Sequence, residues 1–341
     1  MRIAIVTPSA ASTRTGNRHT AQRYAAFLHD AGHRVRVVSS WDGGECDLMI
    51  ALHARKSHDS IARFRARFPA RPLIVVLTGT DLYRDIRVDA AAQGSLEAAT
   101  VLVTLQDMGA LELAPRLRPK VRPVYQSARV SRRAQPPRRN FRVCVLGHLR
   151  DEKDPFRAAL ALRHLPGAVG IEVLQVGDAL TPAMAEEAAR LGRADARYRW
   201  IGGVPHSRAL AWLAASHLLV VSSKMEGGAN VVCEAARAGV PVLASRVRGN
   251  VGMLGREYPG YFPLGESGTW LLRFPSTIFF AYGTSVHAPE PSQRQPWKGH
   301  WIALPTTLPP TPRCAPRCGQ YASSTWGTPS SPRNITSSRP K

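Results

Sequence analysis

Two glutamates set eight positions apart flank a pair of glycines in the segment MEGGANVVCEAARAGVPVLAS, residues 225–245. Glu226 precedes Gly227 and Gly228, and Glu234 follows within a helical pattern. Glycine lets the backbone approach a ligand closely, and a helix that begins just after it points free N–H groups at the same place. The segment therefore predicts an anion site, suited to a diphosphate, with two carboxylates beside it.

The two carboxylates suit different hydroxyl groups of a sugar nucleotide. Glu226 stands at the edge of the loop, where a carboxylate can accept hydrogen bonds from a sugar. Glu234 lies about one turn inside the helix that starts near Ala229, on the same face as Asn230, and can bind both hydroxyls of a ribose. For Glu226 alone, an acid that merely complements the helix dipole is an equally good explanation. The glycines and the strand that follows favour the binding site.

Two series of apolar strands and helices surround this segment, separated by a linker at residues 131–140, SRRAQPPRRN. In the first domain, residues 1–130, we expect strands at 2–7, 34–39, 47–53, 73–78 and 101–105, and helices at 17–31 and 57–68. In the second domain, residues 141–265, we expect strands at 141–147, 171–176, 198–201, 218–222 and 240–244, and helices at 154–164, 182–191, 207–215 and 230–238.

Continuously apolar strands that alternate with helices indicate parallel sheets covered on both faces. We therefore predict an α/β protein of two doubly wound, Rossmann-like domains, with a cleft where the carboxyl ends of the two sheets face each other. The pattern ends near residue 265, and residues 269–341 hold one acidic residue, Glu290, and a dozen prolines. We expect residues 266–341 to be an aberrant tail, disordered or translated out of frame. Its Cys314 and Cys318 form one pair, which is too few ligands for a metal site.

The charge of the chain favours anionic partners. Basic residues outnumber acidic ones 46 to 24, for a formal net charge of +22. Such a chain attracts nucleotides and phosphorylated small molecules, although a generally basic surface explains the excess equally well. No motif that reads nucleic acid and no apolar run that could span a membrane is visible. The first residues lack a signal-peptide pattern and the five cysteines show no disulfide framework, so we expect a cytoplasmic protein.

The segment EGGANVVCEAARAGVPVLAS resembles the E-x7-E signature of retaining GT-B glycosyltransferases of family four. Further segments resemble the selenosugar synthases of selenoneine biosynthesis, a branch of that family: TPSAASTRTGNRHTA, ALHARKS, LTGTDLYRD, CVLGHLRDEKDPFRAALA, SSKMEGGANVVCEA and SRVRGNVGMLGREYPGYFP. The resemblance covers residues 1 to about 265. It implies a GT-B fold and the transfer of a sugar from a UDP-sugar, with UDP-N-acetylglucosamine the expected donor, to selenophosphate. No metal or other cofactor is expected.

The resemblance also implies roles for single residues. Glu226 would lie near the donor sugar, and Glu234 would bind the nucleotide ribose. Lys153 matches a lysine that binds the donor diphosphate, whereas the usual arginine position holds His148. We therefore expect the second positive contact from Arg150, with a solvated basic loop as the alternative. The other donor-binding positions lie in strand-end loops and at the helix start: Gly16, Gly203, Val204, Gly227, Gly228, Ala229 and Asn230.

The first domain is expected to bind the acceptor. Many relatives carry His-Gly-x-Asp after a strand of this domain, and Thr78 replaces the histidine here. A hydroxyl acceptor gains from a base, but a selenophosphate is already an anionic nucleophile, which needs charge pairing and orientation instead. The expected acceptor-binding residues lie near predicted strand ends: Arg14, Arg18, Arg55, Lys56, Asp81 and Arg84. His53 is the remaining candidate for acid–base work, although a histidine that caps a strand is the commoner outcome.

Two other functions remain open. One is a GT-B glycosyltransferase with a hydroxyl or lipid acceptor, which would ignore selenophosphate. The other is an inactive, truncated homologue that acts at most as a binding protein, or that binds nucleic acid through its charge with a steep dependence on salt. The aromatic residues are not interleaved with the basic ones, which disfavours nucleic acid.

Overall fold

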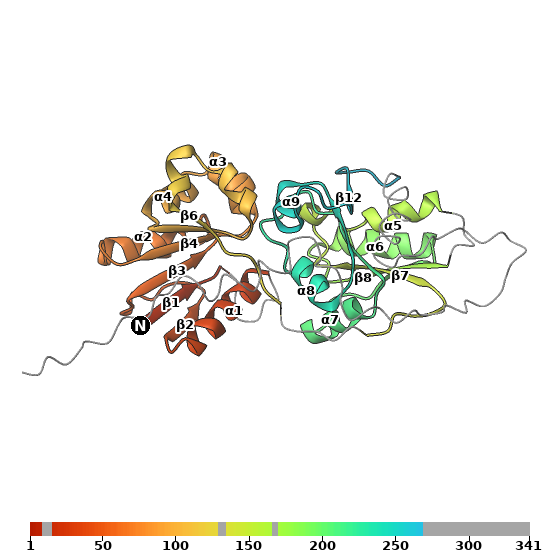
Figure 1. The fold of residues 1–341 in the computed structure, drawn as a ribbon, viewed down its shortest axis with the longest axis horizontal. Coiled ribbons are helices and arrows are strands. Elements are labelled where there is room, and N and C mark those ends of the chain that lie inside the picture. Colours follow the sequence, from red (N-terminus) through yellow and green to blue (C-terminus); the bar gives the residue numbers. More distant parts are fainter. Residues whose placement is uncertain (9–15, 129–133, 166–169, 269–341) are drawn as a thin grey trace, which may run out of the picture.

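The computed structural model describes residues 1–8, 16–128, 134–165 and 170–268. Within them the chain forms two lobes, each built on a six-stranded parallel sheet (Figure 1). Arg14, residues 131–133 of the expected linker and residues 269–341 of the expected tail, with Cys314 and Cys318, lie outside the described residues.

The first sheet has the strand order β2-β1-β3-β4-β5-β6. Its strands are β1 (Arg2–Val6), β2 (Arg34–Val38), β3 (Leu48–Leu52), β4 (Leu73–Leu77), β5 (Val101–Thr104) and β6 (Val121–Pro123). Its helices are α1 (Gly16–Asp30), α2 (His58–Arg67), α3 (Ile86–Val88) and α4 (Ala90–Ala98), with the short helices η1 (Asp81–Asp85), η2 (Asp107–Glu112) and η3 (Pro115–Lys120).

The second sheet has the strand order β12-β11-β10-β7-β8-β9. Its strands are β7 (Phe141–Leu146), β8 (Ile171–Val176), β9 (Tyr198–Trp200), β10 (Leu218–Val221), β11 (Val242–Ser245) and β12 (Tyr261–Phe262). Its helices are α5 (Arg157–Ala161), α6 (Pro182–Ala194), α7 (His206–Ala214), α8 (Asn230–Ala238) and α9 (Arg248–Leu254), with the short helices η4 (Asp151–Lys153) and η5 (Leu162–His164).

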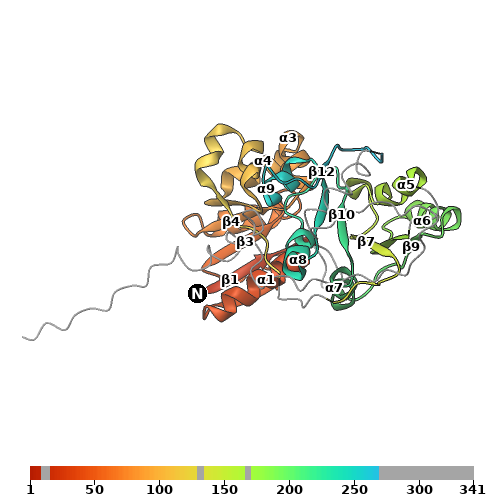
Figure 2. The same ribbon diagram turned by 45° about the vertical axis from the view of Figure 1, so that its right-hand side comes forward.

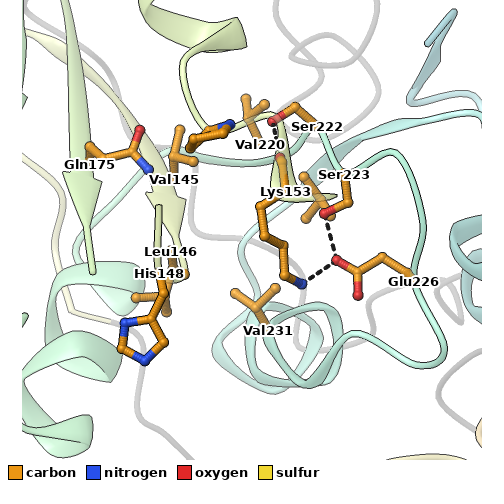
Figure 3. A pocket seen from close by; sticks show the side chains of 13 residues that line it. Val145, Leu146, His148, Lys153, Gln175, Val220, Ser222, Ser223, Glu226 and Val231 are labelled. Atoms are coloured by element: carbon orange, nitrogen blue, oxygen red, sulfur yellow. Dashed lines mark hydrogen bonds and ion pairs between the residues drawn. The ribbon is translucent and has the colours of Figure 1, made fainter. Parts of the chain in front are cut away.

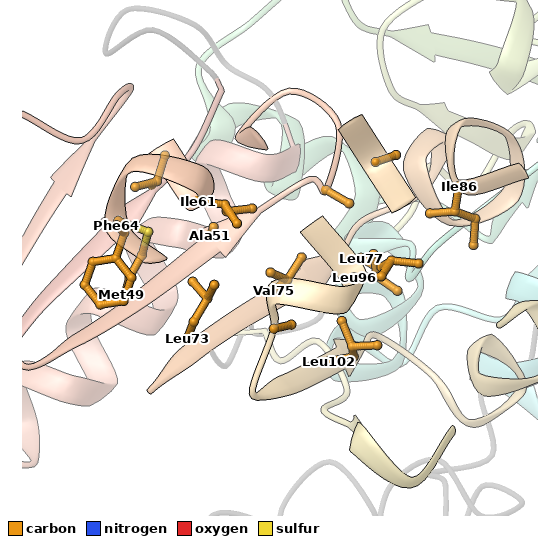
Figure 4. Packing of buried hydrophobic residues seen from close by; sticks show 14 of the residues in the cluster. Met49, Ala51, Ile61, Phe64, Leu73, Val75, Leu77, Ile86, Leu96 and Leu102 are labelled. Carbon is orange, nitrogen blue, oxygen red and sulfur yellow. The ribbon is translucent and has the colours of Figure 1, made fainter. Parts of the chain in front are cut away.

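Buried apolar side chains cover both faces of the first sheet, which explains why its central strands are continuously apolar. On one face Met49 and Leu73 pack with Phe64 of α2 and Leu96 of α4 (Figure 4). On the other face a second cluster joins Ile5 to the small side chains of α1. The predicted α/β class with two doubly wound domains is thereby confirmed.

Several elements differ from the prediction. The helix expected at 154–164 begins only at Arg157, because Pro155 disfavours helical geometry at Asp154, which has a φ of 44°. The sequence pattern did not predict α4, β6, α9 or β12. Of these, α9 has the sequence RGNVGML, which is too short and too rich in glycine for its apolar residues to form a recognisable helical pattern. Figures 1 and 2 both place α1, α8 and α9 where the two lobes meet. No helix of the described ranges has the length and apolar character needed to cross a membrane.

Candidate functional site

A pocket lies at the carboxyl ends of β7, β8 and β10 in the second lobe (Figure 3). Parallel strands leave their last residues and the following loops at one edge of the sheet, which is where ligands bind in doubly wound folds. The polar side chains that line the pocket are His148, Lys153, Gln175, Ser222, Ser223 and Glu226. Lys153 was predicted to bind the donor diphosphate and Glu226 to lie near the donor sugar, and the fold brings the two together over 73 residues of sequence.

The Lys153 ammonium and the Glu226 carboxylate form an ion pair in this pocket. Lys153 Nζ donates to Glu226 Oε1 at 2.5 Å, and Ser223 Oγ donates to the same oxygen at 2.6 Å. The second oxygen of Glu226 points away from both donors (Figure 3). Glu226 is only 7% exposed, so these donors replace much of the hydration that its charge has lost. One carboxylate oxygen thus accepts two hydrogen bonds, and the other accepts none from these two donors.

Two loops hold the lysine and the glutamate in register. Ser222 Oγ donates to the carbonyl oxygens of Lys153 at 3.2 Å and Asp154 at 2.7 Å. The Lys224 N–H donates to the carbonyl of Glu152 at 2.9 Å. Because the loop after β10 is tied to η4 in this way, the spacing of the ion pair is set by backbone contacts as well as by the two charges.

Gly227 and Gly228 lie against the first lobe. A Cβ atom on Gly227 would stand 2.2 Å from the Thr78 carbonyl oxygen, and one on Gly228 would stand 2.4 Å from the Leu105 Cβ. The sequence predicted that glycine is needed here for close approach of a ligand. In the structure both glycines closely approach the ends of β4 and β5, so a side chain here would push the two lobes apart. A close approach of the donor to these glycines stays a prediction.

The start of α8 faces the start of α1 across the lobes. Arg23 of α1 donates to Asn230 Oδ1 at 2.8 Å and to Gln126 Oε1 at 3.1 Å. A Cβ atom on Gly16 would lie 3.8 Å from Asn230 Nδ2. Helix N-termini carry partial positive charge, so this junction of two helix starts and an arginine is suited to an anion. The predicted donor residues Gly16, Ala229 and Asn230 therefore meet at one place.

Glu234 lies on the buried face of α8, outside the residues that line the pocket. Its Oε1 is 3.5 Å from His206 Nε2, and the His206 ring stacks on His19 of α1 at 4.5 Å. Burial raises the pKa of Glu234 to about 7, against the opposing charge of Arg23. Burial likewise lowers the pKa of His206 and of His19. Near pH 7 the Glu234 carboxyl is therefore about half protonated, and the imidazole of His206 is mainly neutral.

Other predicted donor residues lie around the pocket rather than in it. Arg150 is exposed and does not line the pocket, whereas His148 does. The Asp178 N–H donates to His148 Nδ1 at 3.2 Å. A Cβ atom on Gly203 would lie 1.9 Å from Asp178 Oδ1, so a side chain here would displace the exposed Asp178 carboxylate. Val204 packs at the edge of a hydrophobic cluster of the same lobe.

A charged cluster occupies the ends of β3 and β4 in the first lobe. His53 is buried, with a φ of 73°, and its Nε2 lies 3.0 Å from Thr80 Oγ1. Burial lowers the pKa of His53. Asp85 accepts from Arg55 Nε at 2.9 Å and from Arg84 Nε at 3.2 Å. The two arginines predicted to bind an acceptor are thus already paired with one carboxylate.

Asp81 was predicted to bind the acceptor, but its contacts are with the backbone. Its Oδ1 accepts from the N–H groups of Thr78 and Gly79, both at 2.9 Å, and its Oδ2 accepts from the Ala54 N–H at 3.0 Å. Both oxygens are engaged and the side chain is fully buried, so Asp81 shapes the turn after β4. Of the remaining expected acceptor residues, Lys56 is exposed and Arg18 is half-buried near the start of α1.

Along the face of α1 that lies against the second lobe, the sequence pattern predicted Gly16 but not His19, Thr20 or Arg23. Gly16, His19, Thr20 and Arg23 follow a spacing of three, four and seven, which places them on one face of the helix. Thr20 Oγ1 accepts from Gln126 Nε2 at 2.7 Å, and Gln126 Oε1 accepts from Arg23. This polar stripe was the available signal, and it marks the interface between lobes.

Comparisons with known proteins agree with this geometry. Residues 128–263, less than half of the chain, match the family model described as glycosyl transferases group 1. HepE of Anabaena, solved with UDP and glucose, is 16% identical, with a TM-score of 0.62 over 82% of this chain and 92% of its own. The sucrose-phosphate synthase of Thermosynechococcus elongatus, also 16% identical, has a TM-score of 0.65 over 82% of this chain and 90% of its own.

The fold is GT-B. The family match and the GT-B neighbours together support a GT-B glycosyltransferase whose pocket lies in the matched lobe. No curated protein matched the chain. The finer likeness to selenosugar synthases stays a prediction. Within the described residues, no three histidine, cysteine, aspartate or glutamate side chains gather in a way that could hold a metal ion.

Proposed function

We propose that this chain is a metal-independent, UDP-sugar-dependent glycosyltransferase of the cytoplasm. The observation that carries the proposal is the Lys153–Glu226 ion pair in a pocket at the carboxyl ends of β7, β8 and β10. It combines a cation for phosphate with a carboxylate for sugar hydroxyls. The junction of the α1 and α8 starts, with Arg23, supplies further positive potential nearby.

In this proposal the donor replaces the contact between Lys153 and Glu226 with contacts to itself. The Lys153 ammonium turns from Glu226 towards a phosphate oxygen, and the Glu226 carboxylate then accepts hydrogen bonds from hydroxyls of the sugar. As the bond between the sugar carbon and the phosphate oxygen breaks, negative charge grows on the leaving UDP. Groups that already point at that charge stabilise it without reorganisation. Glu234, reached when His206 moves aside, binds the ribose hydroxyls.

For the acceptor we propose selenophosphate, with UDP-N-acetylglucosamine as the donor, so that a carbon–selenium bond replaces the carbon–oxygen bond to UDP. This finer step is supported by the resemblance in sequence. An anionic acceptor would meet the basic side chains at the strand ends of the first lobe, namely Arg18, Arg55, Lys56 and Arg84. Soft, anionic selenium needs no base to remove a proton.

The direct test is UDP release from purified full chain supplied with UDP-N-acetylglucosamine and selenophosphate, with the selenosugar identified by mass spectrometry. We expect turnover by the wild type and a loss of at least about 100-fold in Glu226→Gln and in Lys153→Met. Glu186→Gln, which changes an exposed carboxylate on α6, is the matched control and should behave as the wild type. A folded wild type that neither binds UDP nor releases it from the sugar nucleotide contradicts the proposal.

A hydroxyl acceptor is the second candidate, and one observation favours it. Arg55 and Arg84 both contact Asp85, which reduces the positive charge available to an anion. Burial lowers the pKa of His53, so its ring is neutral near pH 7 and can accept a proton from a hydroxyl. Under this alternative, selenophosphate neither reacts nor competes, and His53→Gln lowers turnover with a hydroxyl acceptor.

A further inference from the structure

A chain of buried polar side chains lies behind Glu226. Ser223 Oγ donates to Glu226 Oε1 at 2.6 Å, and Ser245 Oγ donates to the carbonyl oxygen of Ser223 at 2.6 Å. Asn250 Nδ2 donates to the carbonyl oxygen of Ser245 at 2.9 Å and to its Oγ at 3.1 Å. These contacts connect α9, the end of β11 and the loop after β10 to one oxygen of the glutamate.

The three supporting side chains are almost inaccessible to water. Ser245 and Asn250 are fully buried, and Ser223 is 2% exposed. The Ser245 carbonyl oxygen, which also accepts from the Val247 N–H at 2.8 Å, can only accept hydrogen bonds, so the Asn250 amide nitrogen must be the atom that faces it. In that orientation Asn250 Oδ1 has no hydrogen-bond partner among the described residues. Burying an unsatisfied amide oxygen is costly, and the two hydrogen bonds that the Asn250 nitrogen donates to Ser245 offset that cost.

The backbone of Glu226 is held from the same helix. A Cβ atom on Gly249, beside Asn250 in α9, would stand 1.7 Å from the Glu226 carbonyl oxygen. Only glycine lets α9 lie this close to the loop. The helix therefore fixes Glu226 twice, at its carbonyl through Gly249 and at its carboxylate through Asn250, Ser245 and Ser223.

We propose that Ser223, Ser245 and Asn250 are positioning residues that hold the Glu226 carboxylate for the donor sugar. Ser223 donates to the same carboxylate oxygen as Lys153, so the carboxylate keeps one hydrogen bond, and with it its orientation, when Lys153 turns to the diphosphate. Without Ser223 the Glu226 carboxylate would move with the Lys153 ammonium or rotate about its side-chain bonds. It would then no longer be held in the orientation that binds the donor sugar. This proposal rests on the proposed function, because it assigns Glu226 to the sugar of a UDP-sugar.

The test compares Ser223→Ala and Ser245→Ala with Ser216→Ala in the full chain. Ser216 is a matched control, because it is equally buried and donates to the Trp212 carbonyl at 2.7 Å, at the opposite end of β10 from the pocket. We expect Ser223→Ala to lower kcat/KM for UDP-N-acetylglucosamine by about 10- to 100-fold, as for the loss of a hydrogen bond to a charged group. Ser245→Ala should give a smaller loss, and Ser216→Ala none.

Two further measurements separate positioning from general destabilisation. The affinity for UDP, measured by calorimetry, should change by less than about 2-fold in Ser223→Ala, because UDP lacks the sugar that Glu226 contacts. When Glu226 is already replaced by glutamine, Ser223→Ala should lower kcat/KM only a little further, because Ser223 acts through the Glu226 carboxylate.

The outcomes are distinguishable. Equal losses for UDP and for the UDP-sugar, or additive losses in the double variant, would overturn the positioning role while leaving the proposed function intact. A wild type that binds UDP but shows no preference for any UDP-sugar would overturn the positioning role as well. Failure of the wild type to bind UDP at all would instead remove the proposed function, and the positioning role with it.

Discussion

Replacing Glu234 with glutamine should stabilise the protein at alkaline pH and weaken donor binding. Burial raises the pKa of this carboxyl from 4.5 to about 7. A pKa difference of one corresponds to about 1.36 kcal/mol, so this difference corresponds to roughly 3 kcal/mol of folding free energy. A raised pKa means that the folded protein binds the proton more tightly than the unfolded chain. The stabilising contribution is therefore complete below about pH 4.5 and is lost as the pH rises through about 7.

Glu234→Gln is neutral at every pH and should not incur this loss. Urea unfolding without nucleotide at pH 5 and pH 8 should give similar stabilities at pH 5 and a variant more stable by up to about 3 kcal/mol at pH 8. The charged or titratable groups that act on Glu234 are His206 and Arg23, and both proteins retain them. Glu186→Gln, at an exposed site on α6, should show no such pH-dependent difference.

The same change should affect donor binding in the opposite direction. Ribose hydroxyls donate to the ionised carboxylate, so the affinity of the wild type for a UDP-sugar should rise between pH 6 and pH 8. The variant should bind about 10- to 100-fold more weakly and without that rise. A variant less stable than the wild type at pH 8, or a stability difference that does not change with pH, would refute the reasoning.

Three shorter predictions follow. Gly249→Ala should destabilise the protein by at least about 2 kcal/mol in thermal unfolding, because the new methyl group meets the Glu226 carbonyl. Gly192 of α6 is the control, since a methyl group there has its nearest neighbour, the Tyr198 carbonyl oxygen, at 3.8 Å. Gly192→Ala should therefore stabilise the protein by roughly 0.5–1 kcal/mol. Arg23→Met should weaken UDP-sugar binding by about 10-fold in calorimetry, because Asn230 loses the contact that holds the α8 start to the first lobe, and an unchanged affinity would contradict this. Turnover should survive EDTA, since lysine and helix starts carry the diphosphate in the proposed site, and loss of activity that Mg²⁺ restores would contradict that assignment.

Much of the fold follows from local sequence pattern. Strands such as LIVVL of β4 are apolar at every position, which requires burial on both faces and so a parallel sheet covered by helices. The glycine pair and the two acids could be located because a helix start after a strand end has the same geometry wherever it occurs. Elements that depend on packing were missed. In α9, for example, Val251, Met253 and Leu254 are recognisable as core residues only once they pack against the hydrophobic cluster of the second lobe.

The partners of the site residues could not be predicted in the same way. Asp81 carries the residue type of an acceptor ligand, yet its two oxygens accept from backbone N–H groups of the loops after β3 and β4. Arg55 and Arg84 are basic residues at strand ends, but Asp85 takes their contacts. Residue type and distance from a strand end do not reveal which opposite charge the fold brings near.

The sequence by itself determined the two parallel sheets, the edge at which a ligand would bind, and the acids and lysine placed there. Only the tertiary structure decided that Lys153 pairs with Glu226, that Arg23 meets Asn230 across 207 residues, and that α9 supports the glutamate from behind. The reason is physical. Strand and helix patterns arise from interactions between near neighbours in the chain, whereas charge pairing and burial depend on which distant segments share a dry interior.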